Sequence, residues 1–188
     1  MSYELIAIGA SWGGLEAMGQ LLDRVPPEVE QAIVVAQHRS AESTRGVLES
    51  LLQQHTSRAV REPGDKEPIE PRHVYVAPPD YHLLVEGGRF ALSIEARVQY
   101  ARPSIDVLFE SVAEAYRERA IGIVLTGANA DGAAGLSAIK RNGGVAVVQD
   151  PLTAARKEMP AAALAAAEAD AVLPLDDIGP FLLGLCCG

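Results

Sequence analysis

The chain contains 188 residues, 48% of them apolar and 22% charged, which is the composition of a globular protein with a substantial core. Its formal net charge of −9 argues against nucleic-acid binding, because that function depends on Lys and Arg that neutralise phosphates. No apolar run approaches the ~20 residues of a membrane span, and the N-terminus lacks the basic region of a signal peptide.

The two cysteines, Cys186 and Cys187, are adjacent in the sequence and cannot cross-link distant parts of a fold. No group of Cys and His has the spacing of a zinc site, so no metal is expected. A reducing cytoplasm is the simplest compartment for this chain.

The first predicted unit is a strand, a tight turn and a helix. Leu5 to Ile8 is a buried-strand run, and Leu15 to Leu22 has helical spacing. The turn contains Gly9-Ala10-Ser11-Trp12-Gly13, which matches the Gly-x-Ser-x-Gly pattern of a nucleophile elbow. The same residues leave open that Ser11 merely caps the helix. A dinucleotide site is disfavoured, because the Rossmann pattern requires Gly at the position of Ser11.

Strands and helices continue to alternate along the chain, which predicts parallel pairing with right-handed crossovers. Expected strands lie at 32–36, 74–77, 121–125, 144–148 and 171–173, and expected helices at 47–52, 105–116, through 136–139, at 161–169 and from 176 onward. A hairpin is predicted at 83–92, turning at Gly87 and Gly88, and a loop at 62–71. The predicted fold class is α/β, a three-layer doubly wound, mostly parallel sheet with helices on both faces and one antiparallel β-hairpin, in a single domain over residues 1–188.

Three chemically complementary residues follow predicted parallel strands. Ser11, His38 and Asp131 each come after a strand, and the carboxyl ends of such strands share one edge of the sheet. A serine hydroxyl is a poor nucleophile until a base takes its proton; histidine is that base near neutral pH, and a carboxylate orients the imidazole. The three residues together therefore suggest an acyl-transfer triad.

Each residue also has a structural interpretation when taken alone. His38 could be a loop histidine, and Asp131 could cap the helix that follows it. His55 and His73 are expected to be structural, whereas His82 could reach the same edge. The order Ser, His, Asp excludes the α/β-hydrolase class, in which the acid precedes the histidine.

At these positions the chain resembles the catalytic domain of the chemotaxis protein-glutamate methylesterases (CheB type). The resemblance extends over nearly the whole chain. Its motifs are Gly9-Ala10-Ser11-x-Gly13-Gly14, Gln37-His38, Val74-Tyr75-Val76-Ala77-Pro78, His82, Arg102-Pro103-Ser104-Ile105-Asp106-Val107-Leu108-Phe109, Leu125-Thr126-Gly127, Asp131-Gly132-Ala133, Gln149-Asp150 and Met159-Pro160.

The resemblance implies a serine carboxylesterase without metal or cofactor. Such enzymes hydrolyse methyl esters of glutamate side chains on chemoreceptors, releasing methanol, and deamidate certain glutamines. By position, the nucleophile is Ser11, the base His38 and the acid Asp131. The implied partners are the methylated cytoplasmic helices of chemoreceptors and, in addition, a separate receiver or chemosensory signalling protein.

The chain departs from the family pattern at three places. Trp12 stands where a small hydroxyl residue is usual, and Ala128-Asn129 stands where Met-Gly is usual. Only two residues precede Tyr3, where the first predicted unit begins, whereas many members carry a receiver domain there. We expect the backbone N–H groups of Trp12 and Ala128 to form the oxyanion site, and Asn129 to adopt the positive φ that glycine would allow.

A second hypothesis belongs to a different class. The chain could be a non-catalytic methylesterase-like binding module in a signalling complex, with the changes at Trp12, Ala128 and Asn129 marking lost activity. The presence of Ser11, His38 and Asp131 favours the enzyme.

Overall fold

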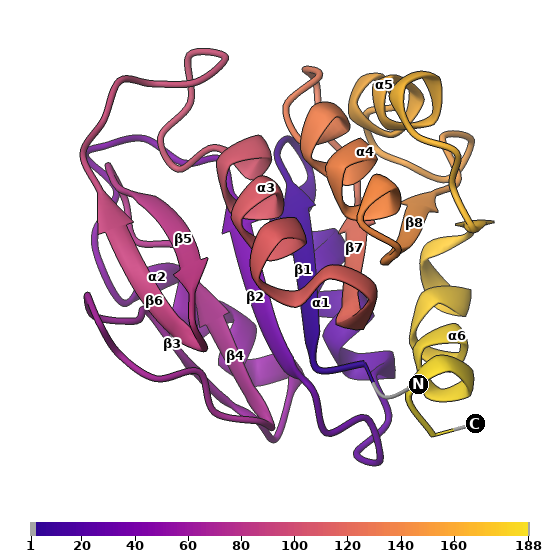
Figure 1. Ribbon diagram of the computed structural model, residues 1–188, viewed down its shortest axis with the longest axis horizontal. Helices are drawn as coiled ribbons and strands as arrows, with labels where there is room; N and C mark the ends of the chain where they lie inside the picture. Colours follow the sequence, from indigo (N-terminus) through magenta and orange to yellow (C-terminus); the bar gives the residue numbers. More distant parts are fainter. Residues whose placement is uncertain (1–2, 188) are drawn as a thin grey trace.

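The computed structural model describes residues 3–187, which form a seven-stranded sheet and a separate two-stranded sheet (Figure 1). Every neighbouring pair in the large sheet is parallel. The strands are β1 Leu5–Ala10, β2 Ala32–Gln37, β3 Ala59–Arg61, β4 His73–Val76, β5 His82–Glu86, β6 Arg89–Ser93, β7 Ala120–Val124, β8 Val145–Gln149 and β9 Ala171–Leu173. The α-helices are α1 Gly14–Arg24, α2 Val47–Leu52, α3 Ile105–Tyr116, α4 Ala133–Arg141, α5 Glu158–Ala166 and α6 Leu175–Cys187.

The strand order β3-β4-β2-β1-β7-β8-β9 places the first strand at the centre. From β1 the chain builds one half of the sheet through β2, β3 and β4. It then crosses to the other side of β1 and builds the second half through β7, β8 and β9. The direction of winding therefore reverses between β1 and β7, and such a switch point opens a crevice at the carboxyl ends of the strands.

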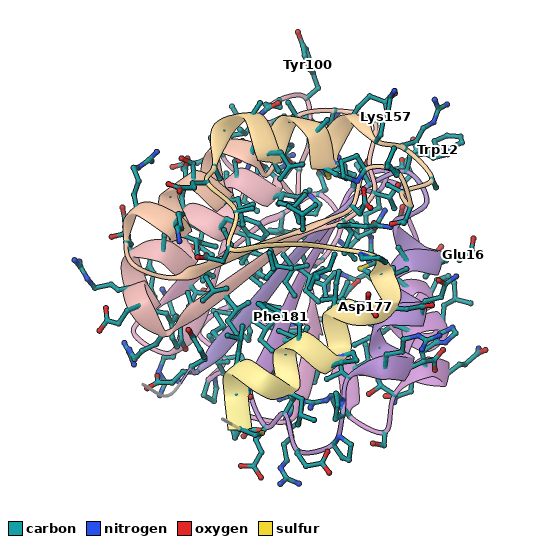
Figure 2. All side chains as sticks on the ribbon, turned by 90° about the vertical axis from the view of Figure 1, so that its right-hand side faces the viewer. Trp12, Glu16, Tyr100, Lys157, Asp177 and Phe181 are labelled. Atoms are coloured by element: carbon teal, nitrogen blue, oxygen red, sulfur yellow. The ribbon has the colours of Figure 1, made fainter. Side chains whose placement is uncertain are left out.

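Both faces of the central strands are covered, so β1 and β7 are buried throughout. On one face Ile6 and Ile8 belong to an apolar cluster that includes Met18 of α1 and Ile178 of α6. On the other face lie α3, α4 and the β5–β6 hairpin (Figure 1), whose apolar side chains form the second cluster. The two helical layers with the sheet between them are visible in Figure 2. The predicted three-layer arrangement is thus confirmed.

The turn of the hairpin follows the sequence prediction. Gly87 and Gly88 both have positive φ, 54° and 75°, as a tight two-residue connection requires. In the antiparallel register of β5 and β6, His82 lies opposite Ser93 and Glu86 lies opposite Arg89.

Two details differ from the sequence prediction, the strand β3 and the start of α5. The edge strand β3 was not expected, because it has only three residues, of which Ala59 and Arg61 are exposed. Helix α5 begins at Glu158 rather than 161, since Pro160 falls in its first turn, where the missing N–H is not needed. The predicted helix at 47–52 is confirmed as α2, in which Leu52 is buried while Val47 and Leu51 are 51% and 39% exposed.

Between residues 3 and 187, the structure contains no helix that is both long and apolar enough to span a membrane.

Candidate active site

The three residues singled out in the sequence meet at the switch point. Ser11 follows β1, His38 follows β2 and Asp131 follows β7. The Oγ atom of Ser11 lies 3.1 Å from Nδ1 of His38. The Nε2 atom of the same imidazole lies 2.6 Å from Oδ2 of Asp131. The ring thus bridges hydroxyl and carboxylate, with its two nitrogens exchanged relative to the trypsin arrangement.

Ser11 does not cap helix α1, so that interpretation of the turn is wrong. The N-cap position is Gly13, whose φ of 75° allows a sharp entry into the helix, and no side chain caps it. The backbone N–H of Ser11 donates to the carbonyl of Thr126 at 2.9 Å, and the N–H of Gly14 donates to the carbonyl of Ser11. The turn therefore holds the serine backbone while its side chain faces His38.

Asp131 is completely buried, and its carboxylate binds the N-terminus of α3 rather than that of α4. Its carboxylate accepts hydrogen bonds from Ser104 Oγ and from the backbone N–H groups of Ile105 and Asp106, at 2.7–2.9 Å. Helix α4 is instead preceded by Gly132, so the prediction that Asp131 might cap that helix is wrong. Burial acts to raise the pKa of Asp131, but the hydrogen bonds from His38, Asp106 and Ile105 together hold that pKa below its ordinary value.

The ionised carboxylate determines the tautomer of His38. A charged carboxylate can only accept hydrogen bonds, so the 2.6 Å contact requires a proton on Nε2. The other nitrogen, Nδ1, then carries a lone pair directed towards Ser11. This is the tautomer that a general base for Ser11 requires.

His82 contributes to the site indirectly, through its hydrogen bond with Ser104. Its Nε2–H donates to the carbonyl of Ala96 at 3.0 Å, which leaves Nδ1 to accept from the N–H of Ser104 at 3.2 Å. His82 therefore orients Ser104, which binds Asp131, and it forms no hydrogen bond with Ser11 or His38. His55 and His73 bond to Asp23 and to the carbonyl of Pro71.

Gln37 ties the serine and histidine loops together, which sequence reasoning missed. Its Nε2 donates to the carbonyl of Ser11 at 2.9 Å and to the carbonyl of His38 at 3.1 Å. Gly14 makes room for this amide, since a Cβ there would lie 2.1 Å from Gln37 Oε1. A usable signal was an amide side chain at the carboxyl end of a buried strand, next to the candidate base.

Asn129 is the second residue whose role the sequence did not reveal. Its backbone does not adopt positive φ, so the glycine-like conformation expected for it is wrong. Its Oδ1 accepts the N–H of Asp131 at 3.1 Å, and its Nδ2 lies 3.2 Å from His38 Nδ1. The side chain, and not the backbone conformation, is what distinguishes this position.

The two backbone N–H groups that are expected to bind an oxyanion have no hydrogen-bond acceptor within the described part of the protein. Within residues 3–187, the N–H groups of Trp12 and Ala128 donate no hydrogen bond. The carbonyl of Trp12 accepts from Thr126 Oγ1 at 2.9 Å, which ties the serine loop to the loop after β7. The indole of Trp12 is 65% exposed and points outward (Figure 2), and the Arg156 guanidinium lies over it, 5.6 Å from the ring centroid.

Two open cavities flank the Ser11–His38 pair. One, of about 500 Å³, is lined by Ser11, Leu15 and Leu51 between α1 and α2. The other, of about 650 Å³, is lined by His38, Tyr100 and Asn129, among others. Open space therefore lies beside Ser11 on one side of the pair and beside His38 on the other.

A hydroxyl, an imidazole and a buried carboxylate in this geometry define the class of serine hydrolases. Within that class, the chain belongs to the CheB methylesterase family, whose model matches residues 6–182.

Relatives and a solved structure agree with that membership. The chain is 47% identical to a protein of Leptospira interrogans over 186 residues, 98% of this chain and 96% of the relative. It is 40% identical to a protein-glutamate methylesterase/protein-glutamine glutaminase of Bordetella parapertussis, over 97% of this chain and 53% of that protein. The CheB methylesterase catalytic domain of Thermotoga maritima superimposes with a TM-score of 0.88 and 31% identity, covering 98% of this chain and 100% of the other.

Proposed function

We propose that this chain is a protein-glutamate methylesterase, with protein-glutamine deamidase activity at the same site. The observation that carries the proposal is the imidazole of His38, which lies 3.1 Å from Ser11 Oγ and 2.6 Å from the buried Asp131 carboxylate. Family membership and the names of the relatives support the substrate class.

The acylation step follows from this geometry. Ser11 Oγ attacks the ester carbonyl carbon of a glutamyl methyl ester while His38 Nδ1 takes the hydroxyl proton. The carbonyl oxygen becomes an oxyanion, which the free N–H groups of Trp12 and Ala128 would bind. The C–O bond to methoxide then breaks, His38 returns the proton to the leaving group, and methanol departs from an acyl-Ser11 ester.

Deacylation repeats the sequence with water. His38 removes a proton from water, the hydroxide adds to the acyl carbon, and Ser11 leaves with the proton from His38. The product is a glutamate carboxylate. With a glutamine substrate the leaving group of the first half is ammonia, and the second half is identical.

The expected partner is a methylated chemoreceptor helix, and the expected location the cytoplasm. The two cavities beside Ser11 and His38 support an extended protein substrate, because they leave both flanks of the hydroxyl open. A separate receiver or chemosensory signalling protein is a second expected partner.

The experiment is release of methanol from receptor-containing membranes whose glutamates carry radiolabelled methyl esters. The wild-type protein should release methanol, and Ser11→Ala, at equal concentration and with an unchanged circular dichroism spectrum, should not. Mass spectrometry of the same receptors tests whether glutamine is converted to glutamate. Absence of release by wild type on receptors from its own source would favour a non-catalytic binding module.

A further inference from the structure

Two hydrogen-bond donors converge on one lone pair in this site. Nδ1 of His38 lies 3.1 Å from Ser11 Oγ and 3.2 Å from Asn129 Nδ2. With the proton of the neutral ring on Nε2, Nδ1 offers a single in-plane lone pair. Ser11 and Asn129 therefore compete for the same acceptor.

The orientation of the Asn129 amide is set by the backbone. Its Oδ1 accepts the N–H of Asp131 at 3.1 Å, so its NH₂ group must face His38. A flipped amide would lose the bond from Asp131 and would direct an oxygen at the lone pair of Nδ1. The contact is thus a donor–acceptor pair, N–H to N.

A donor at Nδ1 distinguishes the two protonation states of the ring. It stabilises the neutral imidazole, whose lone pair it occupies. It opposes the imidazolium, whose Nδ1–H would meet the N–H of the amide. From this geometry we infer that Asn129 is a positioning residue that keeps His38 in its neutral, proton-accepting form.

Other charged groups also surround the imidazole. Asp131 bonds to Nε2. The cavity beside His38 is further lined by Arg39 and Glu42 from the loop after β2, and by Arg97 and Arg102 from the segment before α3. Arg39 is paired with Glu62, and Arg102 with Asp80. Because these groups are unchanged in variants of Asn129, their influence cancels when the variants are compared.

Two substitutions at Asn129 distinguish hydrogen-bond donation to His38 from a role in holding the loop together. Asn129→Ala removes both the donor and the bond to the N–H of Asp131. Asn129→Asp keeps an oxygen for that N–H but replaces the donor with a carboxylate, which accepts from a protonated Nδ1. Because the carboxylate of Asn129→Asp favours a protonated imidazole in any case, Asn129→Ala is the decisive variant: a merely structural role would leave its His38 titration at the wild-type midpoint.

The inference rests on the proposed function for its kinetic measurement only. The first measurement is the NMR titration of the His38 imidazole, assigned with His38→Gln. The second is the pH dependence of kcat/KM for methanol release. Loss of one hydrogen bond should move the titration midpoint and the acid limb of Asn129→Ala upward by about 0.5–1 pH unit. The carboxylate of Asn129→Asp should move both upward by at least one unit relative to wild type.

The NMR titration separates failure of the inference from failure of the proposed function. If no protein releases methanol, the order of midpoints still tests the role of Asn129. Midpoints rising from wild type to Asn129→Ala to Asn129→Asp support the inference. A midpoint in Asn129→Ala that equals or falls below that of wild type would overturn it, whatever the midpoint of Asn129→Asp.

Discussion

Asp131 and Asp106 each bind the beginning of the other's helix. Asp131, in the loop before α4, accepts the N–H groups of Ile105 and Asp106 where α3 begins. Asp106, in the first turn of α3, accepts the N–H groups of Gly132 and Gly135 where α4 begins, at 2.9 and 2.7 Å. The proposed acid of the triad is therefore also a structural element, held in place by a reciprocal contact between two helices.

This reciprocal contact predicts a pH-dependent stability. Burial, together with the nearby charge of Asp131, raises the pKa of Asp106 above its ordinary 3.8. The folded state then retains a proton that the unfolded state has released. The contribution of Asp106 to the free energy of unfolding therefore falls as pH rises from about 3.8 through the folded pKa.

Asp106→Asn should remove that dependence. Its Oδ1 still accepts from Gly132 and Gly135, and Gln99, which now donates to Asp106 Oδ2 at 2.8 Å, can turn its amide oxygen to the new NH₂. Urea unfolding at several pH values should show the variant gaining stability relative to wild type as pH increases. A difference that stays constant across the series would mean that Asp106 titrates alike in folded and unfolded chains.

For Asp131 we predict the opposite pH dependence of the free energy of unfolding. Its folded pKa is lowered, so the stability that its carboxylate provides is present above the ordinary value of 3.8 and is lost as pH falls through the folded pKa. Asp131→Asn should therefore be destabilised near neutral pH, with the deficit shrinking in acid. Denaturant titrations of wild type and variant provide the comparison; a deficit that grows in acid would contradict this sign.

The amide of Gln37 should be needed to align the two catalytic loops. Gln37→Glu puts a carboxylate oxygen against the carbonyls of Ser11 and His38, which now accept from Nε2. Misplacement of a catalytic group by about 1 Å can cost on the order of 10²-fold in rate. We expect kcat for methanol release to fall by about that factor. As a matched control, Gln20→Glu makes the same change at an exposed amide of α1 that lines neither of the two cavities and should retain activity.

The oxyanion assignment predicts a contrast at Ala128. Ala128→Met restores the residue usual in the family and should keep kcat within a few-fold, because the N–H is unchanged. Ala128→Pro removes the N–H and should lower kcat by about 10²–10³. Circular dichroism checks that the proline variant folds. Full activity in a folded Ala128→Pro protein would exclude this N–H as an oxyanion donor.

The sheet could be predicted from sequence because its central strands are buried on both faces. Runs such as 32–36 and 121–125 are almost wholly apolar, and burial alone explains them. The strand β3 lies at an edge, is only partly buried and leaves no comparable pattern. Helix α2 spans the predicted residues 47–52, because helical spacing alone marks it, although Val47 and Leu51 are exposed.

At the site, residue types after strands were sufficient to select Ser11, His38 and Asp131, since parallel strands deliver such residues to one edge. Their partners were harder to predict. Gln37 acts by donating to backbone carbonyl groups, so its only sequence signal is an amide at the end of a buried strand next to His38. At Asn129 the sequence indicates a role for the backbone conformation, whereas the side-chain amide makes the contact with His38.

The central claim is that Ser11 and His38 act as one unit in ester hydrolysis. The most direct measurement is kcat for methanol release by Ser11→Ala, His38→Ala and the double variant, each checked for folding. Residues that act as a unit are strongly non-additive, so each single variant should lose nearly all activity, and the double variant should lose no more than either. Wild-type turnover in folded Ser11→Ala, or losses that simply multiply in the double variant, would contradict the claim.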